Sequence, residues 1–138
     1  MVEVIVVMAV FAVTISVAFP FLGRFQQTVS LDTVTQEVTH TLRRARHRAM
    51  TGQRDSAWGV QILSESYILY AGNSYATRSS NFDELHVPRG SYSFSEISDV
   101  RFEKISGRTL GPFTITVSHA LGGTGTILIN TAGGIFLQ

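Results

Sequence analysis

The chain has 138 residues, of which 44% are hydrophobic and 15% are charged, and its formal net charge is +1. This length allows one domain with one appended element, and the charge balance excludes a disordered charged tail or a strongly basic nucleic-acid module. Because the chain contains no cysteine, a disulfide scaffold, a thiol nucleophile and a zinc site built on thiolates are also excluded.

The first predicted element is an apolar helix over residues 1–23. No ionisable side chain occurs from Val4 to Gly23, and about 20 such residues are long enough to span a bilayer. A cleavable secretory signal is the alternative, but it needs a basic segment before the apolar run, where this chain has only Glu3. We therefore expect a single-pass membrane protein, although Arg24 after the span leaves its orientation open.

Three residues of this segment are unusual for a simple anchor. The Glu3 carboxylate costs roughly 2.5–3.5 kcal/mol inside hydrocarbon, so it needs a partner or a role unless it lies outside the span at the headgroups. Pro20 removes a backbone hydrogen bond, and Gly23 weakens the same stretch of helix. The helix is therefore predicted to kink or melt locally around residues 16–23.

An amphipathic helix is predicted to continue the rod over residues 24–52. Apolar residues recur at spacings of three and four and form one stripe, made of Leu31, Val34, Val38, Leu42, Ala45 and Ala49. The opposite side carries polar residues, namely Gln36, His40, Arg43, Arg44 and His47. Gly52 predicts the C-terminal end of this helix.

A basic cluster lies in this helix and consists of Arg43, Arg44, Arg46 and Arg48. One interpretation is a patch for the phosphates of nucleic acid or of lipid headgroups. The alternative is a solvated helix face whose arginines complement the C-terminal end of the helix dipole. No aromatic residues interleave with the cluster to stack on bases, which favours the alternative.

The period changes to two from Ser56 onward, which predicts a β-domain over residues 53–138. A hairpin of residues 58–62 and 67–70 comes first, and a long polar loop over residues 72–90 follows it. Alternating pairs then predict strands around residues 92–94, 100–102, 113–117, 127–129 and 135–137. About five to seven strands would form one antiparallel sheet that buries the apolar stripe.

The predicted fold class is therefore α+β. A long N-terminal α-helix, with a membrane or filament-core half and an amphipathic half, packs on a small antiparallel β-sheet. No catalytic motif is found, the histidines lack the spacing of a chelating set, and the glycine-rich turn at residues 122–125 precedes no helix that could cradle a phosphate. We expect no enzyme activity, no cofactor and no metal.

The terminal acidic residue, the apolar span with a late proline, the long half-exposed helix and the small β-domain together resemble the type IV pilin and type II secretion pseudopilin superfamily. Glu3 and Pro20 match that family's glutamate and proline in their mutual spacing. The run Leu42–Ala49 resembles the L-x-x-A-R-x-x-A signature of GspH/FimT-type pseudopilins. Phe102 with Gly107, and the closing residues 127–135 with their two glycines, also resemble that family's sheet.

The resemblance implies a structural subunit of a type IV pilus-like or type II secretion filament, major or minor. It implies that Glu3 neutralises the N-terminal amine of a neighbouring subunit and that the helix gives way around Pro20 and Gly23. The mature chain would begin two residues before Met1, with a methylated phenylalanine. The implied partners are further copies, other pilins, an inner-membrane assembly platform and membrane lipid before assembly, and the bacterial filament would be extracellular or periplasmic.

Two other functions stay open. The cluster Arg43, Arg44, Arg46 and Arg48 would serve a DNA-binding minor pilin for DNA uptake, although the arginine-rich C-terminal tail of such pilins is lacking. A membrane-tethered β-domain that works alone would tolerate the loss of both Glu3 and Pro20.

Overall fold

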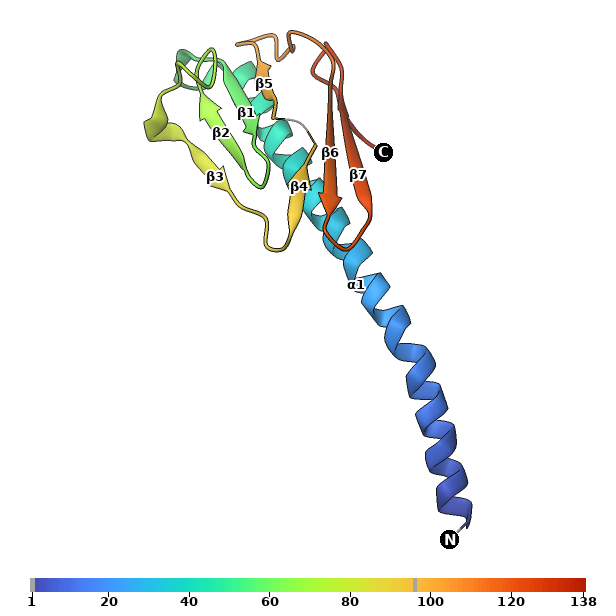
Figure 1. Ribbon diagram of the computed structural model, residues 1–138. Coiled ribbons are helices and arrows are strands. Elements are labelled where there is room, and N and C mark those ends of the chain that lie inside the picture. The colour runs from blue at the N-terminus through green and yellow to red at the C-terminus, as the bar shows by residue number, and fades with distance from the viewer. Residues whose placement is uncertain (1, 96) are drawn as a thin grey trace. The chain divides into compact units, whose positions relative to one another are not determined.

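A computed structural model describes the backbone of residues 2–95 and 97–138 and the side chains of residues 2–16, 30–95 and 97–138. The chain divides into two compact units, residues 1–30 and residues 31–138. Helix α1 (Val2–Met50) supplies the first unit and the beginning of the second. In Figure 1 it is drawn in blue to cyan.

The second unit continues after α1 with two short 3-10 helices and eight strands in the described residues. The 3-10 helices are η1 (Gln53–Asp55) and η2 (Ser80–Phe82). The first four strands are β1 (Trp58–Ile62), β2 (Tyr67–Ala71), β3 (Glu84–His86) and β4 (Tyr92–Phe94). The last four are β5 (Asp99–Phe102), β6 (Phe113–His119), β7 (Thr124–Ile129) and β8 (Ile135–Leu137).

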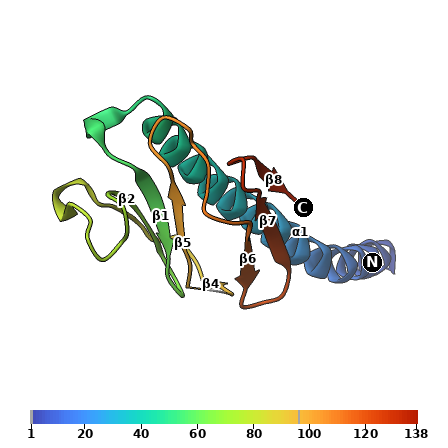
Figure 2. The same cartoon turned by 90° about the horizontal axis from the view of Figure 1, so that it is seen from above.

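These strands form two four-stranded sheets with the orders β3-β2-β1-β5 and β4-β6-β7-β8. Every pairing in them is antiparallel. The chain changes sheets three times, because β4 pairs with β6, β5 returns to pair with β1, and β6 lies in the second sheet again. Seen from above in Figure 2, β1 and β5 lie on one side of the unit and β6 and β7 on the other, with the helix crossing both.

The core forms where the helix meets both sheets. The predicted stripe is confirmed, since all six of its residues are buried: Leu31, Val34, Val38, Leu42, Ala45 and Ala49. Inward side chains of both sheets complete the same cluster, among them Val60 and Phe102 from one sheet and Ile115 and Ile127 from the other. Alternate residues of most strands face this core, which is the period that the sequence showed, whereas β3 contributes none.

Two further predictions about local structure are confirmed. The first hairpin is present, with Trp58 opposite Ala71 and Ile62 opposite Tyr67. The helix ends at Met50, and Gly52 adopts a left-handed conformation with φ 63°, as glycine after a helix commonly does.

The predicted fold class, however, is wrong. It placed the helix on one small sheet, whereas the described strands form two sheets, and strands dominate the second unit. The helical side chains that the structure describes fall in two short stretches, residues 2–16 and 30–50. The periodicity of a strand identifies its buried face but not the strand with which it pairs, so the exchange of β4 and β5 could not be foreseen.

The predicted membrane-spanning helix, and with it the single-pass membrane localisation, is also wrong. Among the residues that the structure describes, no helix is sufficiently long and apolar to cross a bilayer. The backbone is helical from Val2 to Met50, so the local melting predicted around Pro20 and Gly23 is wrong. The side chains of these two residues lie outside those that the structure describes.

The predicted loop over residues 72–90 is wrong in part, because it contains η2 and β3. Strand β3 pairs Leu85 with Ile68 and His86 with Tyr67 at the edge of the first sheet. Strand β3 has only three residues, and its apolar residue, Leu85, is exposed whereas Glu84 and His86 are half-buried. It therefore shows neither the buried apolar alternation nor the β-branched composition on which strand prediction depends.

Candidate functional site

The N-terminal stretch of α1 is the most unusual surface of the described chain. Every residue from Val2 to Ser16 is exposed, including Val2 at 75%, Met8 at 70% and Phe11 at 63%. The large apolar side chains of this surface are Val2, Val4, Ile5, Val6, Val7, Met8, Val10, Phe11, Val13 and Ile15. Contiguous apolar surface of this kind marks an interaction site rather than a water-facing helix.

The polar residues of this stretch do not disturb its apolar character. The Thr14 hydroxyl donates to the Val10 carbonyl oxygen at 2.9 Å, and the Ser16 hydroxyl donates to that of Ala12 at 2.7 Å. Their hydrogen bonds are therefore made within the helix itself, as they are in helices that face apolar surroundings. Glu3 is exposed and makes no ion pair within the described residues, so its charge is available to another molecule.

The run Leu42–Ala49 packs tightly where the helix ends. Leu42, Ala45 and Ala49 have no exposed surface, and the small side chains of the two alanines permit close packing against the helix. Arg46 is half-buried, and its Nη2 donates to the Ala132 carbonyl oxygen at 3.2 Å.

Gly107 and Gly133 complete this contact from two different loops. Both have positive φ, 62° and 78°, and both approach the helix closely. A Cβ on Gly107 would lie 2.6 Å from Met50 Cγ, and one on Gly133 would lie 2.9 Å from Arg46 Nε and collide with the Gly107 carbonyl oxygen. Gly107 and Gly133, which contribute to the resemblance to pseudopilins from separate parts of the sequence, therefore both lie close to Arg46.

The arginine cluster does not form a single basic surface. Glu84 on β3 accepts hydrogen bonds from Arg44 and, at 2.7 Å, from Arg48 Nη1. Arg48 also lies 4.8 Å from the ring centre of Trp58, whereas Arg46 turns to the Ala132 carbonyl. Of the four, Arg43 alone makes no contact with a carboxylate or a carbonyl oxygen in the described part of the chain.

The charge of Glu84 is stabilised by this arrangement. Burial raises the pKa of its carboxyl, but the hydrogen bond from Arg48 and the charges of Arg44, Arg48 and His86 outweigh burial, so the pKa lies below its usual range. The carboxylate therefore stays ionised near neutral pH and balances part of the positive charge of the cluster. The geometry supports an ion-pair contact of Arg44 and Arg48 with Glu84, which joins the helix to β3, better than it supports a phosphate-binding patch.

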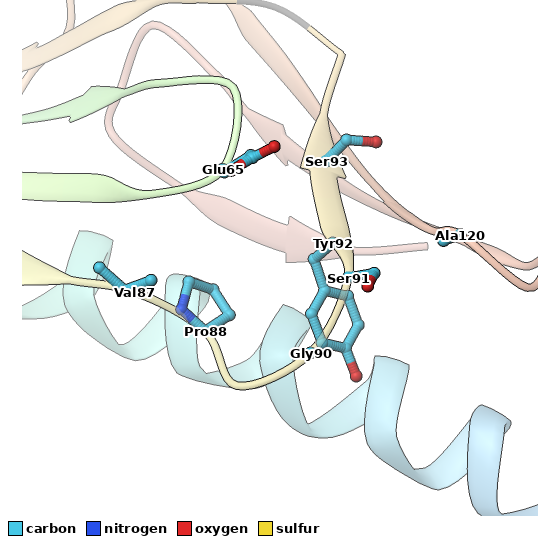
Figure 3. Close-up of a pocket in the computed structure, with 8 residues that line it drawn as sticks. All are labelled: Glu65, Val87, Pro88, Gly90, Ser91, Tyr92, Ser93 and Ala120. Atoms are coloured by element: carbon cyan, nitrogen blue, oxygen red, sulfur yellow. The ribbon is translucent and has the colours of Figure 1, made fainter.

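A pocket of about 340 Å³ opens at one end of the second unit. Figure 3 shows its walls: Glu65 at the turn between β1 and β2, Val87 and Pro88 after β3, Tyr92 on β4, and Ala120 after β6. No pattern in the sequence indicates this pocket, because its residues come from separate segments and belong to no motif.

A second pocket, of about 260 Å³, lies near the end of the helix between η1 and η2. The guanidinium of Arg54 is 3.5 Å from the ring centre of Phe82, and both residues line this pocket. No group of three or more potential ligands that could hold a metal ion occurs among the residues described.

No protein-family model matches this chain, and neither a curated protein nor a solved structure matches it. The resemblance to pilins and pseudopilins therefore stays a prediction.

Proposed function

We propose that this chain is a non-enzymatic structural subunit that assembles through its N-terminal helical stretch into a helical filament, as pilins and pseudopilins do. The observation that carries the proposal is the exposure of every residue from Val2 to Ser16 in a helix that is apolar on nearly all sides. Such a helix needs cover on all sides, and several copies of the same helix supply it.

The energetics favour assembly. Burying one Val, Ile, Phe or Met side chain contributes about 1.5–3 kcal/mol, and ten such side chains are exposed between Val2 and Ile15. Association costs about 4–15 kcal/mol in lost translational and rotational freedom. Covering a few of these side chains on each subunit already offsets that cost.

The first test compares two equally exposed residues in the full chain. Phe11 is 63% exposed in the N-terminal stretch, and Leu85 is 62% exposed on β3. The wild-type chain, Phe11→Asp and Leu85→Asp would each be purified in mild detergent, diluted out of it, and examined by sedimentation and electron microscopy.

We expect filaments from the wild type and from Leu85→Asp, and at least about a tenfold loss from Phe11→Asp, because an aspartate would be buried among apolar helices. If Phe11→Asp formed as many filaments as the wild type, the proposal would be contradicted. A wild-type chain that forms no filaments would contradict it as well.

The second test concerns Glu3. The resemblance implies that its carboxylate pairs with a neighbouring amine inside the bundle, where an unpaired charge is costly. Glu3→Ala should block assembly while the near-ultraviolet circular dichroism of residues 31–138 stays unchanged. Normal filaments from Glu3→Ala would remove this role from the proposal without affecting the apolar contact.

Nucleic-acid binding through the arginine cluster has less support. Arg44 and Arg48 hold Glu84, and Arg46 holds the Ala132 carbonyl, so a phosphate would have to displace contacts within the chain.

A further inference from the structure

We propose that the second units of successive copies dock head to tail, with Leu110 of one copy entering the pocket formed by Glu65, Val87, Pro88 and Tyr92 of the next. This inference rests on the proposed filament function and specifies a second contact within it. The occupant of the pocket is therefore another copy of this chain.

The donor side is an outward loop over residues 103–111. Leu110 is 74% exposed, more than any other large apolar residue that the structure describes between residues 31 and 138, and Ile105 in the same loop is 70% exposed. Ile105 also has φ 70°, a left-handed conformation that costs a β-branched residue about 1–3 kcal/mol. Strain of this kind is typical of a segment whose shape serves a contact.

The loop is held firmly in its outward position. Thr109, which is 7% exposed, anchors it: its amide donates to the Thr131 carbonyl oxygen at 3.1 Å, and its hydroxyl contacts the Asn130 carbonyl oxygen at 3.0 Å. Because Thr109 points inward, its neighbours Arg108 and Leu110 both point outward. A preorganised loop loses little conformational freedom on docking.

The acceptor side lies at the other end of the unit. Its rim carries exposed apolar surface, since Val87 is 64% exposed and Leu121 next to Ala120 is 71% exposed. Among the residues that line the pocket, Glu65 carries the carboxylate. The pocket volume of about 340 Å³ is at the lower end of the range for ligand pockets, so it has room for Leu110 together with neighbouring atoms of the donor loop.

The charges of the two sides are complementary. Arg108 beside Leu110 is exposed, as is Glu65 in the pocket wall, and neither makes an ion pair in the described chain. A second opposite pair is available, because Glu103 lies in the donor loop and Arg89 lies between Pro88 and Gly90 at the pocket. Docking would therefore bring opposite charges together at both edges of the contact.

The positions of the two sides decide that the contact joins different copies. The donor loop reaches the end of the helix, where the Ile105 amide donates to the Ala49 carbonyl oxygen at 2.9 Å. The turn after Ala120 lies near the first helical residue of the second unit, since a Cβ on Gly123 would lie 3.2 Å from Leu31 Cδ2. Leu31 and Ala49 are about 27 Å apart at about 1.5 Å per helical residue.

A copy therefore cannot fill its own pocket, and Figure 1 shows the loop between β5 and β6 at the opposite end of the sheets from the turn between β6 and β7. A heterologous contact of this kind joins two different surfaces, so its repetition builds an open chain of subunits when the rotation between copies does not close a ring.

The test uses the absence of cysteine in this chain, because introduced cysteines are then the only thiols. The full-length double variant Leu110→Cys with Ser91→Cys would be assembled, sedimented and oxidised. We expect a ladder of dimers, trimers and longer chains on non-reducing gels. The control Leu85→Cys with Ser91→Cys places a thiol of similar exposure on β3 and should give no ladder.

Charge exchange sharpens the result. Glu65→Arg or Arg108→Glu alone should lower the rate of crosslinking about two- to fivefold, and the two together should restore it. Filaments that sediment normally but give no ladder would overturn the docking contact and leave the filament function intact. A wild-type chain that forms no filaments would overturn both.

Discussion

Two stretches of α1 have similar apolar side chains but opposite surroundings. Between Leu31 and Ala49 the apolar residues occupy one stripe, and both sheets bury it, so Val38 and Leu42 have no exposed surface. Between Val2 and Ser16 the apolar residues surround the helix, and every one is exposed. A stripe can be satisfied within one chain, whereas a helix that is apolar on all sides requires cover from other molecules.

The largest effect that would sharpen this comparison comes from truncating one apolar side chain in each stretch. Leu42→Ala should lower the free energy of unfolding by about 2–5 kcal/mol, because it opens a cavity in a fully buried core. Phe11→Ala should change it by less than about 0.5 kcal/mol, as surface substitutions do. Urea unfolding in mild detergent can be followed through Trp58, the single tryptophan of the chain.

The variant that has the smaller effect on stability should have the larger effect on filament assembly. Phe11→Ala should reduce the yield of filaments, and Leu42→Ala should leave the yield of its folded fraction unchanged. Equal destabilisation by both variants would show that the N-terminal stretch is also packed within the chain, and the contrast between the two stretches would fail.

A smaller loss is expected where the buried stripe meets the loops. Gly133→Ala places a methyl group against the Gly107 carbonyl and should cost about 2–4 kcal/mol, part of it from the positive φ. Gly122→Ala is the matched control, because Gly122 also has a positive φ but has nothing within 4 Å of the added Cβ. The difference between the two melting curves isolates the steric term, and equal losses would contradict this packing.

How much of this contrast could be predicted depends on whether the determining contacts are local. The stripe from Leu31 to Ala49 and the first hairpin are set by periods of 3.6 and 2, so the sequence alone predicts them. Strand β3 is not predicted, because Glu84 and His86 owe their place to partners about 36 to 42 residues away on the helix.

The candidate sites divide in the same way. The apolar surface from Val2 to Ser16 is evident in the composition, although the sequence led to a membrane span that the described residues do not contain. The pocket is not evident, because Glu65, Val87 and Ala120 are brought together by the exchange of strands between two sheets. The hydrophobic pattern of the sequence does not predict which sheet each strand joins.

A third prediction separates exposed from packed arginines at the end of the helix. Arg48→Ala should cost about 1 kcal/mol, because it removes the hydrogen bond to Glu84 and the contact with the Trp58 ring. Arg43→Ala should change the free energy of unfolding by less than about 0.5 kcal/mol, since Arg43 is exposed. If the Arg43 variant were the less stable of the two, the proposed ion-pair contact between the arginine cluster and Glu84 on β3 would be wrong.

The smallest effect is a dependence of stability on pH through Glu84. Its pKa is lower in the folded chain than in the unfolded one, so the unfolded state binds the proton more readily. The stabilisation is therefore complete above the usual glutamate pKa of about 4.3 and is lost as the pH falls through the lower, folded value. Because the pair is partly exposed, we expect only about 0.2–1 kcal/mol.

The measurement that isolates this effect is the difference in the free energy of unfolding between wild type and Glu84→Gln. Glutamine keeps the shape of the side chain but not its charge, so the difference should be constant from pH 7 to pH 5.5 and should shrink towards pH 3. Sodium chloride at 1 M should reduce the difference at pH 7, because partly exposed charges are screened. A difference that persists at pH 3 would mean that Glu84 acts through packing, and that β3 is held to the helix without the charges of Arg44 and Arg48.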